Sequence, residues 1–129
     1  MTPDEFRNLA LALPDAQECA HSNHPDFRVG GRIFATLGYP DEAWAMVKLF
    51  PDQQAAFIAT APKAFSPVKG AWGKQGCTSI LLAKAKKRKV QEALHAAWRK
   101  TAVHTAIRKL EAQMPEKRKR RAARAPQPV

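Results

Sequence analysis

The feature that most constrains the fold is the pair Gly30-Gly31, which separates two short segments of alternating apolar and polar residues. A tight two-residue turn requires positive φ angles, and glycine adopts these without steric cost. The pattern therefore predicts a β-hairpin with strands over residues 26–29 and 32–37.

The hairpin predicts which side chains share a face of the sheet. If the two glycines form the loop, Phe27 lies opposite Phe34, and directly opposed residues point to the same side. We therefore expect one face, directed towards helices, to carry Phe27, Val29 and Phe34. The other face would carry Asp26, Arg28, Ile33 and Ala35.

The rest of the chain alternates between strand-like and helix-like segments. Thr2 and Glu5 form a capping-box pattern at the start of a helix that ends near Pro14. We expect strands at 17–22, 44–49 and 77–83, a helix at 51–61 and a loop at 62–76. Antiparallel strands flanked by helices predict an α+β two-layer sandwich.

A further helical region begins near Lys86. At 100° per residue, Val103 is rotated by about 220° from Val90, so the two apolar patterns face different directions. We therefore expect a break near residues 100–101, giving two helices that end before Pro115. The segment 115–129 is charged and then rich in alanine and proline, which predicts a disordered basic tail after a domain at 1–114.

Positive charge is concentrated in the C-terminal third. Residues 1–83 hold 7 basic and 8 acidic side chains, whereas residues 84–129 hold 15 basic and 3 acidic ones. Such asymmetry favours an anionic partner, although a solvated helix face and tail would also produce it. The candidate phosphate contacts in this region are Lys84, Lys86, Lys87, Arg88, Lys89, Lys117, Arg118, Lys119, Arg120 and Arg121, supplemented by Arg99, Lys100, Arg108, Lys109 and Arg124.

The sequence contains no complete catalytic or metal-binding signature. Cys19, His21, His24 and Cys77 are the candidate ligands, but they lack the paired spacing of a zinc site. We therefore expect two unbridged thiols, no metal, no cofactor and no enzymatic activity. The glycine-rich segment 70–76 does not have P-loop spacing. Its Trp72 and Lys74 are either turn residues or contacts for a base and a phosphate.

Three segments resemble the MmcQ/YjbR-like family of small bacterial proteins. They are His24-Pro-Asp-Phe-Arg-Val-Gly-Gly-Arg-Ile-Phe-Ala35, Phe65-Ser-Pro67 with Ala71-Trp-Gly-Lys-Gln-Gly76, and Ala97-Trp-Arg99. The resemblance covers about Thr2 to Met114 and implies a frataxin-like (CyaY-like) fold, with helices on one face of an antiparallel sheet. The family is commonly labelled DNA-binding, which implies the same function here. Many members carry an aromatic residue where this chain has Cys77.

These observations predict a non-enzymatic protein that binds DNA through basic phosphate contacts, with Arg28, Arg32, Trp72 and Lys74 as additional contacts. The alternative is a module that binds a small anionic ligand or a protein on the open sheet face and glycine-rich loop. No signal-like or membrane-spanning segment is evident and there are only two cysteines. We therefore expect a cytoplasmic protein, more often monomeric than oligomeric, with no membrane partner.

Overall fold

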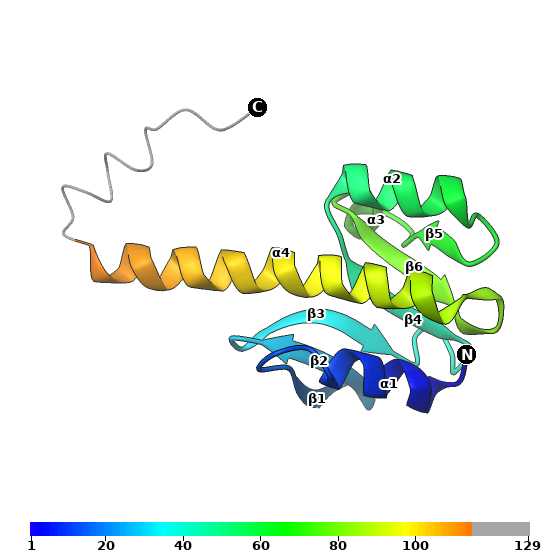
Figure 1. The fold of residues 1–129 in the computed structure, drawn as a ribbon, viewed down its shortest axis with the longest axis horizontal. Helices are drawn as coiled ribbons and strands as arrows, with labels where there is room; N and C mark the ends of the chain where they lie inside the picture. Colours follow the sequence, from blue (N-terminus) through cyan, green and yellow to red (C-terminus); the bar gives the residue numbers. More distant parts are fainter. Residues whose placement is uncertain (115–129) are drawn as a thin grey trace.

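A computed structural model describes residues 1–114 of the chain, and it confirms the α+β two-layer architecture. The strands form one sheet in the order β1-β2-β3-β4-β6-β5, and all neighbouring strands are antiparallel. Figure 1 shows α4 crossing the sheet, with α1 and α2 on either side of it. The elements in chain order are α1 (Pro3–Leu11), β1 (Gln17–His21), β2 (His24–Val29), β3 (Arg32–Leu37), β4 (Trp44–Lys48), α2 (Pro51–Thr60), β5 (Phe65–Pro67), α3 (Ala71–Lys74), β6 (Cys77–Leu81), the 3₁₀ turn η1 (Leu82–Lys84) and α4 (Lys87–Gln113).

The first helix begins as its capping box predicts. The backbone N–H of Glu5 donates to Oγ1 of Thr2, while the Thr2 N–H donates to the Glu5 carboxylate. These bonds satisfy N–H groups that a helix start leaves unpaired. The helix then buries Phe6 and Ala10 completely against the sheet.

The hairpin is confirmed, with φ angles of +59° at Gly30 and +80° at Gly31. Only the glycine hydrogens leave room at the first position, because a Cβ on Gly30 would lie 2.4 Å from Cγ2 of Thr105 in α4. Two constraints therefore require glycine in this turn: the positive φ angles and the close approach of α4.

The register of the hairpin differs from the prediction beyond its first two pairs. A β-bulge between Phe27 and Arg28 places Phe27 opposite Ala35 rather than Phe34. Phe27 and Phe34 both lie in the core, as expected, but Ala35 also joins it and does not face the other way. The bulge offsets the alternation by one residue, so Phe34 and Ala35 both join the apolar core although they are consecutive in β3.

The predicted loop at 62–76 contains two short elements, β5 and α3. β5 has only three residues and ends in a proline, so its sequence carries little strand pattern. The predicted strand at 77–83 ends earlier, at Leu81, and continues into η1.

The predicted break near residues 100–101 is wrong, because α4 continues from Lys87 to Gln113. Its first part buries Val90, Ala93, Leu94, Ala97 and Thr101. Beyond Thr105, which lies against Gly30, the helix protrudes from the domain. The apolar side chains of Val103, Ile107 and Leu110 are about half exposed. The apolar side chains of the rotated pattern remain exposed, so no burial would be gained by breaking the helix. Within residues 1–114, no helix has the length and hydropathy needed to span a bilayer.

The predicted disordered tail at 115–129, including its basic residues, lies outside the described residues.

Candidate nucleic-acid interface

The face of the sheet away from the helices carries polar residues in register. Directly paired residues share a face, and one such row crosses all six strands at Cys19, Asp26, Thr36, Met46, Ser79 and Ser66. Trp44 and Lys48 lie two residues from Met46 on the same strand and therefore on the same face. The strand pairing thus gathers side chains from distant parts of the sequence.

Four members of this row, Thr36, Met46, Ser79 and Ser66, line a hollow of about 870 Å³ together with Trp44 and Lys48. We name it the sheet-face hollow. Its rim includes two strongly exposed aromatic side chains, Tyr39 at 65% and Trp72 at 62%. Lys48 and Lys69 are its lysines, and none of its lining residues is acidic. The lining consists of His21, Ser22, His24, Thr36, Tyr39, Pro40, Trp44, Met46, Lys48, Ser66, Pro67, Val68, Lys69, Trp72, Cys77 and Ser79.

A buried carboxylate anchors one side of this hollow. Asp26 is completely buried, and Arg28 donates to it from Nε at 2.7 Å and from Nη2 at 3.1 Å. Nδ1 of His21 lies 2.8 Å from the same carboxylate. The hydrogen bond from Arg28 is the main cause that holds the pKa of Asp26 below its ordinary value. Arg28, a predicted phosphate contact, therefore already has an anionic partner inside the fold.

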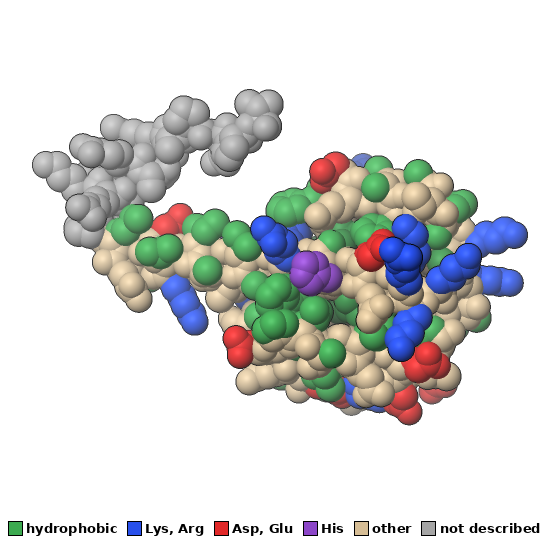
Figure 2. Space-filling model, in the orientation of Figure 1, with side chains coloured by type: hydrophobic (Ala, Val, Ile, Leu, Met, Phe, Trp, Pro, Cys, Tyr) green, Lys and Arg blue, Asp and Glu red, His purple; other side chains and the backbone are tan. Residues whose placement is uncertain are grey.

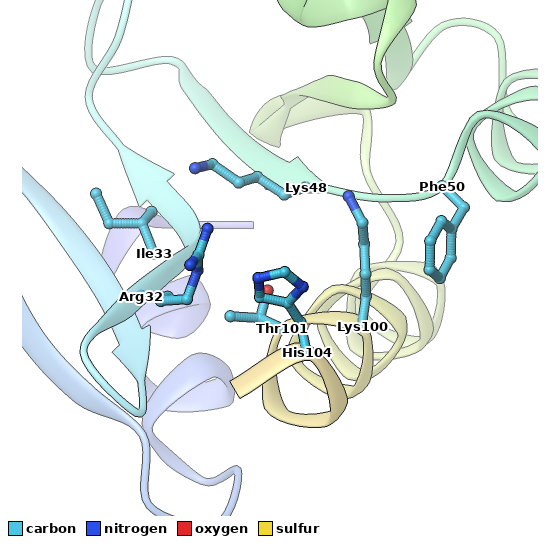
Figure 3. A pocket seen from close by; sticks show the side chains of 7 residues that line it. All are labelled: Arg32, Ile33, Lys48, Phe50, Lys100, Thr101 and His104. Carbon is cyan, nitrogen blue, oxygen red and sulfur yellow. The ribbon is translucent and has the colours of Figure 1, made fainter. Parts of the chain in front are cut away.

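A second hollow, of about 550 Å³, lies at the end of the sheet beneath α4, and we name it the basic pocket. Figure 3 shows the side chains of Arg32, Lys48, Lys100 and His104 directed into it. Ile33, Phe50 and Thr101 complete the lining, so no lining residue is acidic. Four basic side chains therefore converge where no carboxylate lines the pocket to neutralise them.

Local structure explains why these four residues meet. Arg32 begins β3 directly after the turn, and Lys48 ends β4. Because β3 and β4 are antiparallel, the start of one lies at the same end of the sheet as the end of the other. α4 crosses this end, where Lys100 and His104 are neighbours on one helix face at i and i+4, with the buried Thr101 beside them.

Lys100 is held in a fixed position. Its Nζ donates to the carbonyl of Leu49 at 3.3 Å and lies 5.1 Å from the centre of the Phe50 ring. Burial lowers the pKa of Lys100, and the nearby Lys48 adds to this effect. An anion bound beside it would relieve the electrostatic cost of that partly desolvated charge.

The predicted basic cluster at the start of α4 is a separate surface. Lys84, Lys86, Lys87 and Arg88 are exposed, and Lys89 is half-buried. Arg88 and Lys89 pair with Glu92 at 3.7 and 3.4 Å. Figure 2 shows basic side chains gathered over this end of the molecule. Thirteen helical residues, or about 20 Å, separate Lys87 from Lys100.

The structure brings some predicted site residues together and leaves others apart. Arg32 lies in the basic pocket, and Trp72 lies on the rim of the sheet-face hollow. Lys74 is exposed on α3 and lines neither. Sequence reasoning did not identify Lys48 or His104, because Lys48 is the only basic residue of its strand and His104 belongs to no motif. Only the approach of α4 to the sheet end reveals them.

The candidate metal ligands do not converge. Among residues 1–114 there is no group of three or more His, Cys, Asp or Glu side chains placed to hold a metal ion. Cys19 is exposed and Cys77 is buried, and neither forms a disulfide. Burial raises the pKa of the Cys77 thiol, which favours its neutral form.

Comparison with known proteins identifies a solved structure with a similar fold and a matching family. The crystal structure of a Deinococcus radiodurans protein with a DUF419 domain superposes with a TM-score of 0.62 at 17% identity, covering 75% of each chain. At that identity the likeness concerns the fold alone. No curated protein matches the chain. The YjbR family model matches residues 11–100, which include every strand and the first half of α4. This confirms the resemblance drawn from the hairpin and the glycine-rich segment: the chain belongs to the YjbR family.

Proposed function

We propose that this protein binds nucleic acid, and that phosphate groups occupy the basic pocket. The observation that carries the proposal is the convergence of Arg32, Lys48, Lys100 and His104 in a hollow with no acidic lining residue. Phosphates are the anions that clusters of arginine and lysine recognise, by forked hydrogen bonds and by charge.

The overall charge supports a polyanionic partner. The net charge is +11, and the cluster at the start of α4 adds a second exposed basic surface about 20 Å from the pocket. A polymer of phosphates can contact both surfaces at once, whereas a small ion cannot. Contacts of this kind carry no direct sequence information, so we propose binding with little sequence discrimination.

The test is a titration of labelled duplex and single-stranded oligonucleotides at several salt concentrations. The variants are Arg32→Gln and Lys48→Gln, with Lys63→Gln as the matched control, because Lys63 is exposed and lines neither hollow. Each lost phosphate contact should reduce the slope of log affinity against log salt by about 0.9 on duplex or about 0.7 on single strands.

A third variant tests the second surface. Reversing Lys86, Lys87 and Lys89 to Glu should weaken binding to all sequences alike. The proposal is wrong if neither strand form binds at about 50 mM salt, where screening is still moderate. It is equally wrong if the two pocket variants bind as the Lys63 variant does.

One observation favours a small anionic ligand as a second candidate. Both hollows, at about 550 and 870 Å³, have the size of ordinary small-molecule sites. A mononucleotide that bound as tightly as a long strand would support this candidate over the polymer.

A further inference from the structure

The sheet-face hollow adds a chemistry that phosphate binding does not use. Three aromatic side chains, Tyr39, Trp44 and Trp72, line it, and two of them are more than 60% exposed. Single exposed apolar side chains are common on protein surfaces, whereas several gathered around one hollow are typical of an interaction site. Here they surround a floor on the open face of the sheet that contains Thr36, Ser66 and Ser79.

The charge of the hollow indicates what kind of partner covers it. Lys48 and Lys69 are its lysines, and its lining contains no Asp or Glu. A neutral apolar partner would not form ion pairs with these lysines. A partner that combines flat rings with anionic groups would contact both the aromatic side chains and the lysines. Nucleotides have this composition, since each base offers a π-face and each linkage a phosphate.

The two hollows share one lining residue. Lys48 lines both of them, so the sheet-face hollow and the basic pocket meet at this one side chain. A ligand that follows this path places flat groups over the aromatic residues and anionic groups among the basic ones. Successive nucleotides of a strand alternate these groups over short distances.

We propose that the sheet-face hollow binds unstacked bases of single-stranded nucleic acid, whose backbone passes Lys48 into the basic pocket. This inference rests on the proposed function and extends it by naming the form of the nucleic acid. Bases within a duplex are stacked on their neighbours, so their faces are not available to Trp72 or Tyr39. Bases of a single strand are available, and stacking on an aromatic side chain tolerates any sequence.

His21 supplies a polar contact at the edge of the hollow. Its Nδ1 lies against the buried Asp26, which orients the ring and leaves Nε2 for a ligand. Ser66 and Ser79 offer hydroxyl groups on the floor. These groups can bond to base edges without selecting one base.

The experiment compares four labelled probes of equal length with the full chain at about 50 mM salt. They are a single-stranded DNA, a single-stranded RNA, the corresponding duplex, and an abasic strand that keeps the backbone but lacks bases. The variants are Trp72→Ala and Trp72→Phe, and the matched control is Leu110→Ala, which removes a similarly exposed apolar side chain from the protruding part of α4.

We expect Trp72→Ala to weaken single-strand binding by about 5- to 150-fold, the loss of one stacked base. Trp72→Phe should retain part of that affinity, because it keeps an aromatic ring. Binding of the abasic strand should not change in either variant, and Leu110→Ala should bind all four probes as the unaltered protein does. Intrinsic fluorescence should also be quenched by single strands, since Trp44 and Trp72 line the hollow, and quenching should fall in Trp72→Phe.

The two proposals fail in different ways. If the pocket variants weaken binding but Trp72→Ala does not, or if duplex binds as tightly as single strands, the inference about the hollow is wrong and the phosphate contacts stand. If none of the four probes binds, the proposed function is wrong and the inference falls with it.

Discussion

The two faces of the sheet differ in how they use buried side chains. The helix-covered face buries aromatic and aliphatic residues such as Phe27, Phe34 and Ile80 without polar partners. The open face buries a carboxylate, Asp26, and satisfies it with Arg28 and His21. One face is therefore stabilised by removing apolar area from water, and the other by hydrogen bonds that satisfy a buried charge.

The comparison also explains where exposed aromatic residues occur. On the helix side, Phe6 and Phe27 are both completely buried and pack edge to face. On the open side, Tyr39 and Trp72 remain exposed over a hollow. The buried rings and the exposed rings therefore lie on opposite sides of the sheet.

The largest expected effect tests the helix-covered face. Phe27→Ala should lower the free energy of unfolding by about 3–5 kcal/mol, because it removes a buried ring and leaves a cavity. Urea denaturation measures this loss. Tyr39→Ala is the control, and it should cost less than about 0.5 kcal/mol because the ring is mostly exposed. Equal losses for the two variants would show that the faces do not differ as described.

The next effect tests the buried carboxylate on the open face. Asp26→Asn should cost about 1–3 kcal/mol, the usual loss when a charged hydrogen-bonding partner is removed. The loss is smaller than for a fully buried pair, since the side chains of Arg28 and His21 are 32% and 49% exposed and can bind water. Glu42→Gln, an exposed acidic residue, is the control and should change stability little. An Asp26→Asn variant with unchanged stability would mean that the hydrogen bonds of Asp26 only orient Arg28 and His21.

Acid should remove the same contribution without mutation. The pKa of Asp26 is lower in the folded protein than its ordinary value, mainly because of Arg28. Its stabilisation is therefore fully present above the unfolded-state pKa of about 4, and is lost as the pH falls through the folded-state pKa. The difference in stability between the unaltered protein and Asp26→Asn should shrink below about pH 4. A difference that stays constant down to pH 2 would contradict this assignment.

The smallest expected effect separates stability from binding. Trp72→Ala should change the free energy of unfolding by less than about 0.5 kcal/mol, because the ring is 62% exposed. Thermal unfolding monitored by circular dichroism measures it. A loss above about 1 kcal/mol would place Trp72 in the core, and its loss of binding would then have a structural cause.

Much of the architecture could be predicted because local pattern and final fold agree. The capping box at Thr2 and Glu5, the Gly30-Gly31 turn and the antiparallel strands all appear as expected. In each case a short run of residues determines its own backbone geometry, through a hydrogen bond to a nearby N–H or through a positive φ angle.

The incorrect predictions concern features that depend on distant neighbours. The bulge beside Phe27 is visible only when β2 and β3 are paired. The helix break near residue 100 was inferred from an apolar pattern that turned out to face solvent. A periodic pattern shows which side chains share a helix face, but does not show whether anything covers that face.

By itself, the sequence determined the hairpin, the α+β class and the concentration of charge in the last third of the chain, because these follow from short-range sterics and composition. Only the tertiary structure decided where the candidate site lies. Lys48 and Arg32 meet at one end of the sheet because their strands are antiparallel, and Lys100 and His104 join them because α4 crosses that end. Residues 16 to 72 positions apart in the chain become neighbours through packing that no local pattern encodes.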